Sequence, residues 1–461
     1  MDKRYARILT ALLLAALCFG CATTAQVNAP SQRAAALGAT MADAARLARE
    51  QEAQTGEVRA QSTREIERLL AGVDDATLAR EAAILPAGDP LYPYAGRALL
   101  ARGLPLPRPF DRGAQWRFDL NDRPPAERDG YRPPVKLAVL LPLSGPLATA
   151  SAPVRDGFLA GYYGETRRRP EIDFLDTGGT AAGALAAYAK AAAAGVDFVV
   201  GPLGRDEVSA LFASPKLDVP VLALNRGTAA PPVGNAGFSL APEEDGVIAA
   251  EYLLARERRS ALVISGSDDN GRRAAAAFRE RFIERGGSVV ETLSVGETPG
   301  NLSANLAAAA QKDPDSVFLA VRGSTARALA PQLALAGLSA KSRIGTSQLT
   351  MGTGKPEEDA ALDGIVFPTE VWTARGIGGL PTAGAAAVQL PTARGGGARL
   401  FAFGHDAWRL TAYLEHLATG ANAQIQGATG LLRLDGFGNV LRTPAWSSFS
   451  GGRPVPIASD G

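Results

Sequence analysis

The chain has 461 residues, 46% hydrophobic and 21% charged, which is a globular composition and excludes wholesale disorder. Its 48 Lys and Arg against 47 Asp and Glu leave a formal net charge of +1, so no general cationic field exists to hold nucleic acid. Cys18 and Cys21 are the only cysteines, which excludes disulfides, Cys-ligated metals and thiol nucleophiles from the rest of the chain. His405 and His416 lie about 16 Å apart along one predicted helix and cannot share a metal ion. We therefore predict no metal site and no cofactor.

Residues 1–20 have the layout of a secretory signal peptide, with basic residues before the apolar run 8–19. That run is too short for the roughly 20 residues of a membrane-spanning helix. The segment Leu-Cys-Phe-Gly-Cys ending at Cys21 resembles a bacterial lipobox. The resemblance implies lipidation of Cys21, and Ala22 in place of Asp implies the periplasmic face of the outer membrane. A plain signal peptide cut elsewhere is the alternative.

The stretch after the cysteine separates into three segments before the main body. Residues 21–61 have few large apolar side chains, which predicts a tether. Ser62 and Glu65 fit a capping box, so we expect a short helical segment over 62–100. Prolines crowd residues 101–134, which predicts an extended, semi-rigid linker.

From residue 135 onward, apolar strands alternate with amphipathic helices, which predicts α/β architecture with two parallel sheets in two lobes. We expect lobe 1 to comprise 135–241 and 366–420, lobe 2 to comprise 242–365 and 421–451, and 452–461 to be a flexible tail. Chain crossings are then expected near 241, 366 and 420. The expected strands are 136–145, 172–177, 197–202, 219–224, 260–265, 288–295, 316–321 and one around 429–434, and the expected helices are 180–194, 205–213, 243–257, 270–285, 301–311, 324–336 and 400–418.

Motifs for catalysis and nucleotide binding are weak. The glycine pattern 266–273 follows a predicted strand but lacks the Lys and Ser/Thr of a phosphate loop, so an N-capping turn is favoured. No G-x-S-x-G nucleophile elbow is present. His405 beside Asp406 fits a helix-starting histidine with an acidic neighbour better than a catalytic pair. We predict that the protein is not an enzyme.

A cleft is expected where ligands collect in open α/β sheets, beyond the carboxyl ends of the strands. Turn and cap chemistry is the other explanation for the polar residues there. The cleft candidates are Ser144, Gly145, Pro202, Leu203, Asn225, Arg226, Ser267 and Asp268.

Three segments of the body carry a family resemblance. They are Leu140–Gly145 with Val154–Phe158, then Phe403–Leu410, and the glycine-marked run Gln426–Arg442. These segments resemble the type I periplasmic-binding fold and, more specifically, the C-terminal domain of penicillin-binding-protein activator lipoproteins. The resemblance covers about 135–450 and implies an activator of a bifunctional class A penicillin-binding protein. Long members of that family carry a tetratricopeptide-like domain, of which no repeat of about 34 residues is visible here.

A solute-binding lipoprotein of an ABC-type uptake system for amino acids or related small molecules is the alternative, because it shares fold and anchor. By resemblance to amino-acid binders, Ser144 and Asp268 would clamp the solute. Pro142, Pro202 and Leu203 make the rim unusually apolar, which favours the activator.

Overall fold

A helical segment precedes the α/β body in the computed structural model, which describes residues 37–116, 123–214 and 216–458. Its helices are α2 (Ala39–Gln51), α3 (Gly56–Ala71), α4 (Asp75–Ile84) and α5 (Tyr92–Ala101). The predicted tether is therefore wrong from residue 39 onward: α2 packs Met41, Ala44, Ala45 and Ala48 inward. Apart from Met41 these side chains are small, so the stretch showed few large apolar residues. The capping box at Ser62 is also wrong, because Ser62 lies inside α3.

The proline-rich stretch packs onto the body rather than extending as a linker. Its described parts include the 3-10 helix η1 (Asp111–Trp116) and a buried arginine, Arg123, whose Nε donates to Asp197 at 2.8 Å. Arg132 pairs with Glu415 at 2.9 Å and its backbone N–H donates to the carbonyl of Ala412 at 2.8 Å. Proline prevents regular structure, but the arginines between the prolines attach this segment to its neighbours, so the predicted semi-rigid spacer is wrong here.

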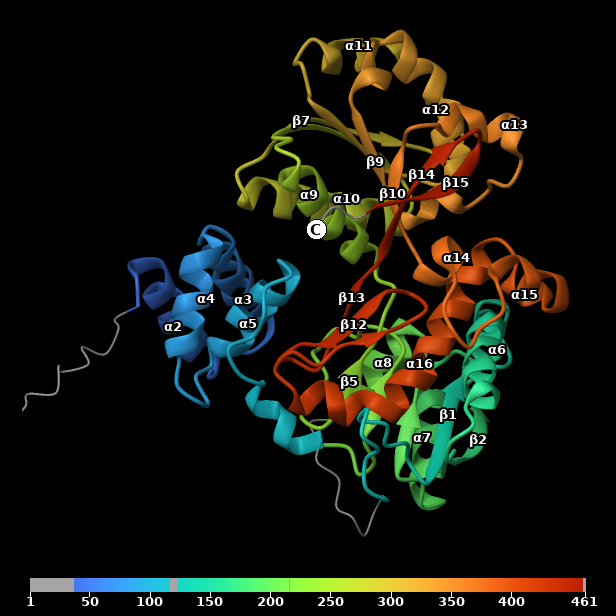
Figure 1. The fold of residues 1–461 in the computed structure, drawn as a ribbon. Coiled ribbons are helices and arrows are strands. Elements are labelled where there is room, and N and C mark those ends of the chain that lie inside the picture. Colours follow the sequence, from blue (N-terminus) through green and yellow to red (C-terminus); the bar gives the residue numbers. More distant parts are fainter. Residues whose placement is uncertain (1–36, 117–122, 215, 459–461) are drawn as a thin grey trace, which may run out of the picture. The chain divides into compact units, whose positions relative to one another are not determined.

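Lobe 1 is built on a five-stranded parallel sheet in the order β2-β1-β3-β4-β5 (Figure 1). Leu137, Val139 and Leu141 of β1 face the helices α6 and α16, whereas Ala138 and Leu140 face α7 and α8. This alternation makes β1 hydrophobic on both faces, as a central parallel strand must be. The elements are β1 (Lys136–Leu141), α6 (Ala148–Gly164), β2 (Glu171–Asp176), α7 (Ala181–Ala193), β3 (Phe198–Val200), α8 (Arg205–Phe212), β4 (Val221–Ala223), β5 (Ala236–Gly237) and α16 (Gly396–Thr419).

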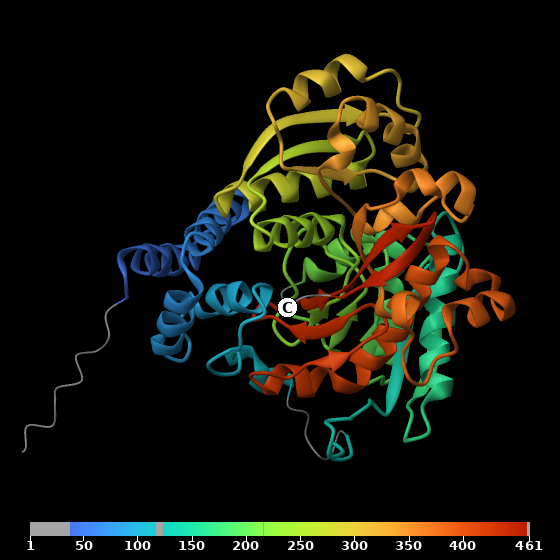
Figure 2. The same cartoon turned by 45° about the horizontal axis from the view of Figure 1, so that its top comes forward.

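Lobe 2 is built on a seven-stranded mixed sheet in the order β15-β14-β10-β9-β8-β6-β7. Figure 2 shows this lobe, in yellow to orange, with the red strands from the end of the chain beside it. Helices α9 and α10 cover one face of it, and α11 and α12 cover the other. The elements are α9 (Pro242–Ala255), β6 (Ser260–Gly266), α10 (Asp269–Glu284), β7 (Ser288–Val295), α11 (Ser303–Ala310), β8 (Ser316–Ala320), α12 (Gly323–Leu335), η2 (Leu338–Ala340), β9 (Ser342–Gly345), η3 (Ser347–Thr350), α13 (Pro356–Asp359), η4 (Ala360–Leu362), β10 (Val366–Thr369), β14 (Ala445–Ser450) and β15 (Arg453–Ile457). The predicted two-lobed α/β fold is confirmed.

The predicted crossing near 420 and the flexible tail are wrong, and the crossing predicted near 366 lies just after Thr369. Strand β10 belongs to lobe 2, pairing with β9 and β14, so the chain returns to lobe 1 only after Thr369. The segment after residue 420 stays with lobe 1, because β11 (Ile425–Gln426), β12 (Leu431–Leu434) and β13 (Val440–Thr443) form a small sheet packed into the lobe 1 core. The last crossing therefore lies between Thr443 and Ala445. Residues 453–457 form β15, an edge strand of lobe 2.

The return through lobe 1 contains α14 (Val371–Arg375), α15 (Ala383–Gln389), η5 (Pro391–Ala393) and the long helix α16. Helices α6 and α16 pack side by side (Figure 1), and glycines allow the close approach. A Cβ atom at Gly157 would lie 1.9 Å from the carbonyl oxygen of Phe401, and one at Gly404 would lie 1.9 Å from that of Val154. No other residue fits at either position without moving backbone.

Candidate functional site

The lobe 1 candidates lie in turns at the carboxyl ends of β1, β3 and β4, as expected for a parallel sheet. The carboxylate of Asp176 accepts the backbone N–H groups of Leu143 at 2.9 Å and Ser144 at 3.2 Å. The hydroxyl of Ser144, first of all, then the backbone N–H of Gly178 and the two bonds above, hold the pKa of Asp176 below its usual range. Gly145 adopts a left-handed conformation, with φ of 77°, next to Gly178. The polar groups of this turn are therefore engaged in shaping it.

The remaining lobe 1 candidates contact one another. The side-chain amide of Asn225 donates to the carbonyl of Leu203 at 2.9 Å, and the backbone N–H of Leu224 donates to that of Pro202 at 3.0 Å. Arg226 pairs with Glu244 of α9 at 2.6 Å. Because α9 belongs to lobe 2, Arg226 ties the strand ends of lobe 1 to the other lobe.

The lobe 2 candidates lie at the end of β6 and serve α10. Asp268 is the N-cap of α10, and its carboxylate accepts the backbone N–H of Gly271 at 2.7 Å. Arg322 lies 4.0 Å from the same carboxylate, and Ser267 contacts Val295 and Arg272. The capping turn favoured over a phosphate loop is confirmed. These contacts keep Ser267 and Asp268 within lobe 2.

A buried charge cluster at the lobe junction was missed by the sequence analysis. We call Asp245, Ser347, Glu370, Arg399 and Arg442 the junction cluster. Asp245, in the first turn of α9, accepts from the backbone N–H of Ser347 at 3.1 Å and from its hydroxyl. Arg399 lies 3.8 Å from Asp245 and 3.2 Å from Glu370. Arg442 of β13 approaches Asp245 at 3.6 Å. Asp245, Glu370 and Arg442 each lie beside one of the three chain crossings between the lobes.

The junction cluster is electrically balanced and shielded from water. The side chains of Asp245 and Arg442 are 2% and 0% exposed, and that of Glu370 is 8% exposed. Breaking a buried ion pair leaves an uncompensated charge, which costs about 3–5 kcal/mol. The cluster therefore favours one angle between the lobes. Its members are far apart in the chain, and no local pattern could have connected them.

The motif Phe403–Leu410 has a structural role. His405 lies well inside α16, which begins at Gly396, so the interpretation as a helix-starting histidine is wrong. Asp406 is fully buried and accepts the backbone N–H groups of Ala428 at 2.6 Å and Thr429 at 2.7 Å, and the hydroxyl of Thr429 at 2.6 Å. It attaches the glycine-marked segment to α16. This engagement explains the acidic residue without invoking catalysis.

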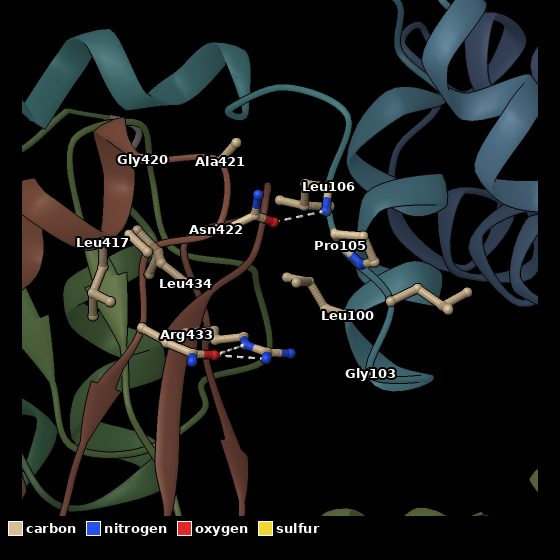
Figure 3. Close-up of a pocket in the computed structure, with 13 residues that line it drawn as sticks. Leu100, Gly103, Pro105, Leu106, Leu417, Gly420, Ala421, Asn422, Arg433 and Leu434 are labelled. Atoms are coloured by element: carbon tan, nitrogen blue, oxygen red, sulfur yellow. Dashed lines mark hydrogen bonds between the residues drawn. The ribbon is translucent and has the colours of Figure 1, made fainter. Parts of the chain in front are cut away.

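A groove lies where the end of α5 meets lobe 1 (Figure 3). Its volume is about 240 Å³, and Asn422 accepts the backbone N–H of Leu106 across it at 3.2 Å. We call this the α5 groove. It is lined by Leu100, Gly103, Leu104, Pro105, Leu106, Leu417, Gly420, Ala421, Asn422, Ala423, Gln424, Arg433 and Leu434.

The described residues show neither a metal-binding cluster nor a membrane-spanning helix. Within 37–116, 123–214 and 216–458, no group of three or more His, Cys, Asp or Glu side chains could hold a metal ion. Over the same residues, no helix combines the length and apolar character needed to cross a membrane. Cys21 lies outside the described residues.

Curated relatives share sequence with the α/β body. "Penicillin-binding protein activator LpoA" of Mannheimia succiniciproducens is 27% identical over 329 residues, covering 70% of this chain and 55% of the relative. The chain therefore spans about half the length of that relative.

Solved structures share the fold. The C-domain of LpoA from Haemophilus influenzae, described as a regulator of PBP1A, matches with a TM-score of 0.60 and 22% identity, over 70% of this chain and 100% of that one. A full-length LpoA from the same organism matches 91% of this chain and 78% of its own, with a TM-score of 0.61 and 19% identity. A putative branched-chain amino acid ABC transporter protein from Chromobacterium violaceum has a TM-score of 0.54 and 28% identity, over 68% and 100%.

The family model described as "LppC putative lipoprotein" matches residues 131–452. This interval contains the lobe 1 sheet, every strand of the lobe 2 sheet except β15, the junction cluster and the buried Asp406. The match begins at Tyr131, where the proline-rich stretch joins lobe 1. The chain belongs to the LppC lipoprotein family.

Proposed function

We propose that this protein is an outer-membrane lipoprotein that activates a bifunctional class A penicillin-binding protein, and so regulates peptidoglycan synthesis without catalysing it. The observation that carries the proposal is the match of 70% of the chain to relatives named as activators of penicillin-binding proteins. Their names describe regulators, in keeping with a noncatalytic role. The partner is the glycosyltransferase/transpeptidase of the same cell envelope.

The strand ends support a binding protein for a macromolecule more than a solute carrier. Asp176 holds the turn at Ser144, Asn225 holds Leu203, Arg226 pairs with Glu244, and Asp268 caps α10. A solute would have to compete with these internal partners. Ligand binding by the cleft candidates stays a prediction.

Activation would follow from differential affinity. A regulator that binds the active conformation of the synthase more tightly shifts the equilibrium toward it. A tenfold gain in rate needs a barrier lowered by only about 1.4 kcal/mol, which a modest interface supplies. Such a regulator needs a stable surface, and the junction cluster supports one by holding both lobes.

The anchor is a separate part of the proposal and rests on the lipobox at Cys21. We expect Cys21→Ser to release the protein into the soluble periplasm, because stable attachment requires a multiply acylated cysteine. Membrane fractionation and palmitate labelling measure this. Continued membrane association of the variant, or an unlabelled wild type, would show that another segment attaches the protein.

The deciding assay mixes residues 22–461 with the purified cognate synthase and its lipid-linked substrate. Glycan polymerisation and peptide cross-linking are read separately, and heat-denatured protein is the control. We expect a rise in at least one activity at saturating protein. Absence of binding and of any rate change, together with tight capture of an amino acid by the same preparation, would favour the solute-binding alternative and overturn the proposal.

A further inference from the structure

The α5 groove is bounded by two parts of the chain that are far apart in sequence. Leu100 and Leu106 lie on the side of the helical segment, and Leu417 and Leu434 lie on the side of lobe 1 (Figure 3). Leu104, between Leu100 and Leu106 in the chain, also lines the groove. Leu100, Leu106, Leu417 and Leu434 are largely buried, so only small parts of these side chains face the groove, whereas Leu104 is more exposed. An occupant would touch both parts at once.

One charge in this groove lacks compensation. The guanidinium of Arg433 donates to the amide oxygen of Gln424 from Nε at 3.0 Å and from Nη2 at 2.7 Å. Burial lowers the pKa of Arg433, and no acidic group counteracts this effect. In the described part of the chain, no carboxylate pairs with it, whereas Arg97 nearby has two, Glu67 and Asp435. A half-buried cation with only a neutral acceptor can gain by pairing with an incoming anion.

The dimensions favour a peptide over a small molecule or lipid. A volume of about 240 Å³ lies below the roughly 300–1,000 Å³ of pockets that enclose drug-sized ligands. It accommodates one or two side chains of a polypeptide that continues outside.

We propose that the α5 groove docks an acidic segment of the synthase, with an Asp or Glu carboxylate on Arg433 and an aliphatic neighbour between the leucines. This rests on the proposed function and assigns its contact surface. Planar pairing of guanidinium with carboxylate makes two parallel hydrogen bonds, which fixes the orientation of the segment as well as its affinity. Because the groove spans two parts of the chain, docking also stabilises their contact.

Charge reversal tests the electrostatic part. We expect Arg433→Glu to weaken binding of the purified synthase to residues 22–461 by about tenfold or more, because like charges would meet in a partly desolvated site. Arg433→Gln, which removes the charge with less steric change, should weaken it less. Arg205→Glu, the same charge change at an exposed position of lobe 1, is the matched control and should leave affinity within about twofold. Thermal melting and circular dichroism show whether each variant is folded.

A photo-cross-linking amino acid at Leu104 tests the location independently of charge. We expect it to capture a synthase peptide containing Asp or Glu beside an aliphatic residue, and Arg433→Glu to abolish the cross-link. Unchanged binding by Arg433→Glu while the wild type still binds and stimulates would overturn the docking site but leave the proposed function intact. If Arg433→Glu lost binding to phosphatidylethanolamine–phosphatidylglycerol vesicles while its binding to the synthase stayed unchanged, the docking site would be overturned in favour of a lipid site. Failure of the wild type to bind the synthase would instead overturn the proposed function.

Discussion

At the scale of single residues, Asp406 connects three groups that lie more than twenty positions away in the chain. We expect Asp406→Ala to leave the backbone N–H groups of Ala428 and Thr429 buried without acceptors, each costing about 1–3 kcal/mol. The free energy of unfolding, measured in urea, should fall by several kcal/mol. Asp43→Ala, which removes only an exposed pair with Arg46, is the control and should change it by less than about 0.5 kcal/mol. Equal stabilities would show that Asp406 is dispensable.

A second prediction concerns pH and Glu284 at the end of α10. Burial, mainly, raises the pKa of Glu284 from 4.5 to about 7; Glu280 and Glu67 raise it further, and Arg281 and Arg68 oppose them. Between these two values the native state binds more protons than the unfolded state, so this contribution to stability is lost as pH rises toward 7.

The variant Glu284→Gln removes that titration. Its unfolding free energy relative to the wild type should therefore increase between about pH 5 and pH 8. Urea unfolding at both values measures the difference, with the exposed Glu52→Gln as control. A difference that stays constant, or that shrinks as pH rises, would show that Glu284 ionises normally in the folded protein.

The role of a single residue could be predicted from the sequence where its hydrogen-bond partner is close in the chain. The capping role of Asp268 follows from its place three residues before Gly271, between a strand and a helix. The partnership of Asp245 with Ser347 spans 102 residues and has no sequence pattern, because a buried ion needs only a partner that the fold brings close. The sequence did not predict Arg433 as a site residue either, because its distinguishing feature is that no carboxylate among the described residues pairs with it in the fold.

At the scale of elements, the crossing of α6 and α16 depends on glycines. Gly157→Ala or Gly404→Ala would place a methyl group within 1.9 Å of a backbone carbonyl oxygen, so the helices must separate. We expect each to cost about 1–3 kcal/mol or more by thermal or urea unfolding. Gly164→Ala, at the end of α6, has its nearest neighbour at 3.8 Å and should be close to neutral. Similar effects for all three would show that the crossing adapts without strain.

The strands β1, β3, β6 and β8 were predictable because parallel strands buried on both faces read as continuous apolar runs. The strands β9, β10 and β14 of lobe 2 were not predicted. The misses have physical causes. Helix α2 buries mostly alanine, so its inward face has the helical spacing but offers little apolar area. Strand β15 contains Pro454 and Pro456, tolerable only at a sheet edge, where it pairs with β14 alone. Its pattern therefore indicated a tail.

At the scale of the whole molecule, the junction cluster sets how far the lobes can move. We expect Asp245→Asn to leave Arg399 and Arg442 undercompensated and to broaden the distances between the lobes. Double electron–electron resonance between spin labels at the exposed positions Leu185 of lobe 1 and Leu335 of lobe 2 measures the distribution of distances between the lobes. The wild type should give a narrow distribution. An unchanged distribution in the variant would assign the lobe angle to other contacts.

The lobes are also expected to be inseparable by a single cut. A fragment of residues 131–241 lacks α16, which covers β1 and supplies Phe403, Leu410 and Leu414 to the lobe 1 core. We expect no cooperative thermal transition for it, whereas residues 22–461 should give one. A cooperatively folded fragment would mean that the core of lobe 1 forms without its late helix.

The position of β14 and β15 has a consequence for export. During export the N-terminus emerges first, so β10 emerges long before β14, which pairs with it, and β15, which pairs with β14. Until those strands arrive, the lobe 2 sheet has an open edge at β10. Lobe 2 therefore cannot complete its fold until residues 445–457 have emerged. Translation stopped after Thr443 should produce a protein that periplasmic proteases degrade, because β10 then lacks its partner β14. Protease resistance equal to that of a chain extending through residue 457 would show that folding of lobe 2 does not depend on these strands.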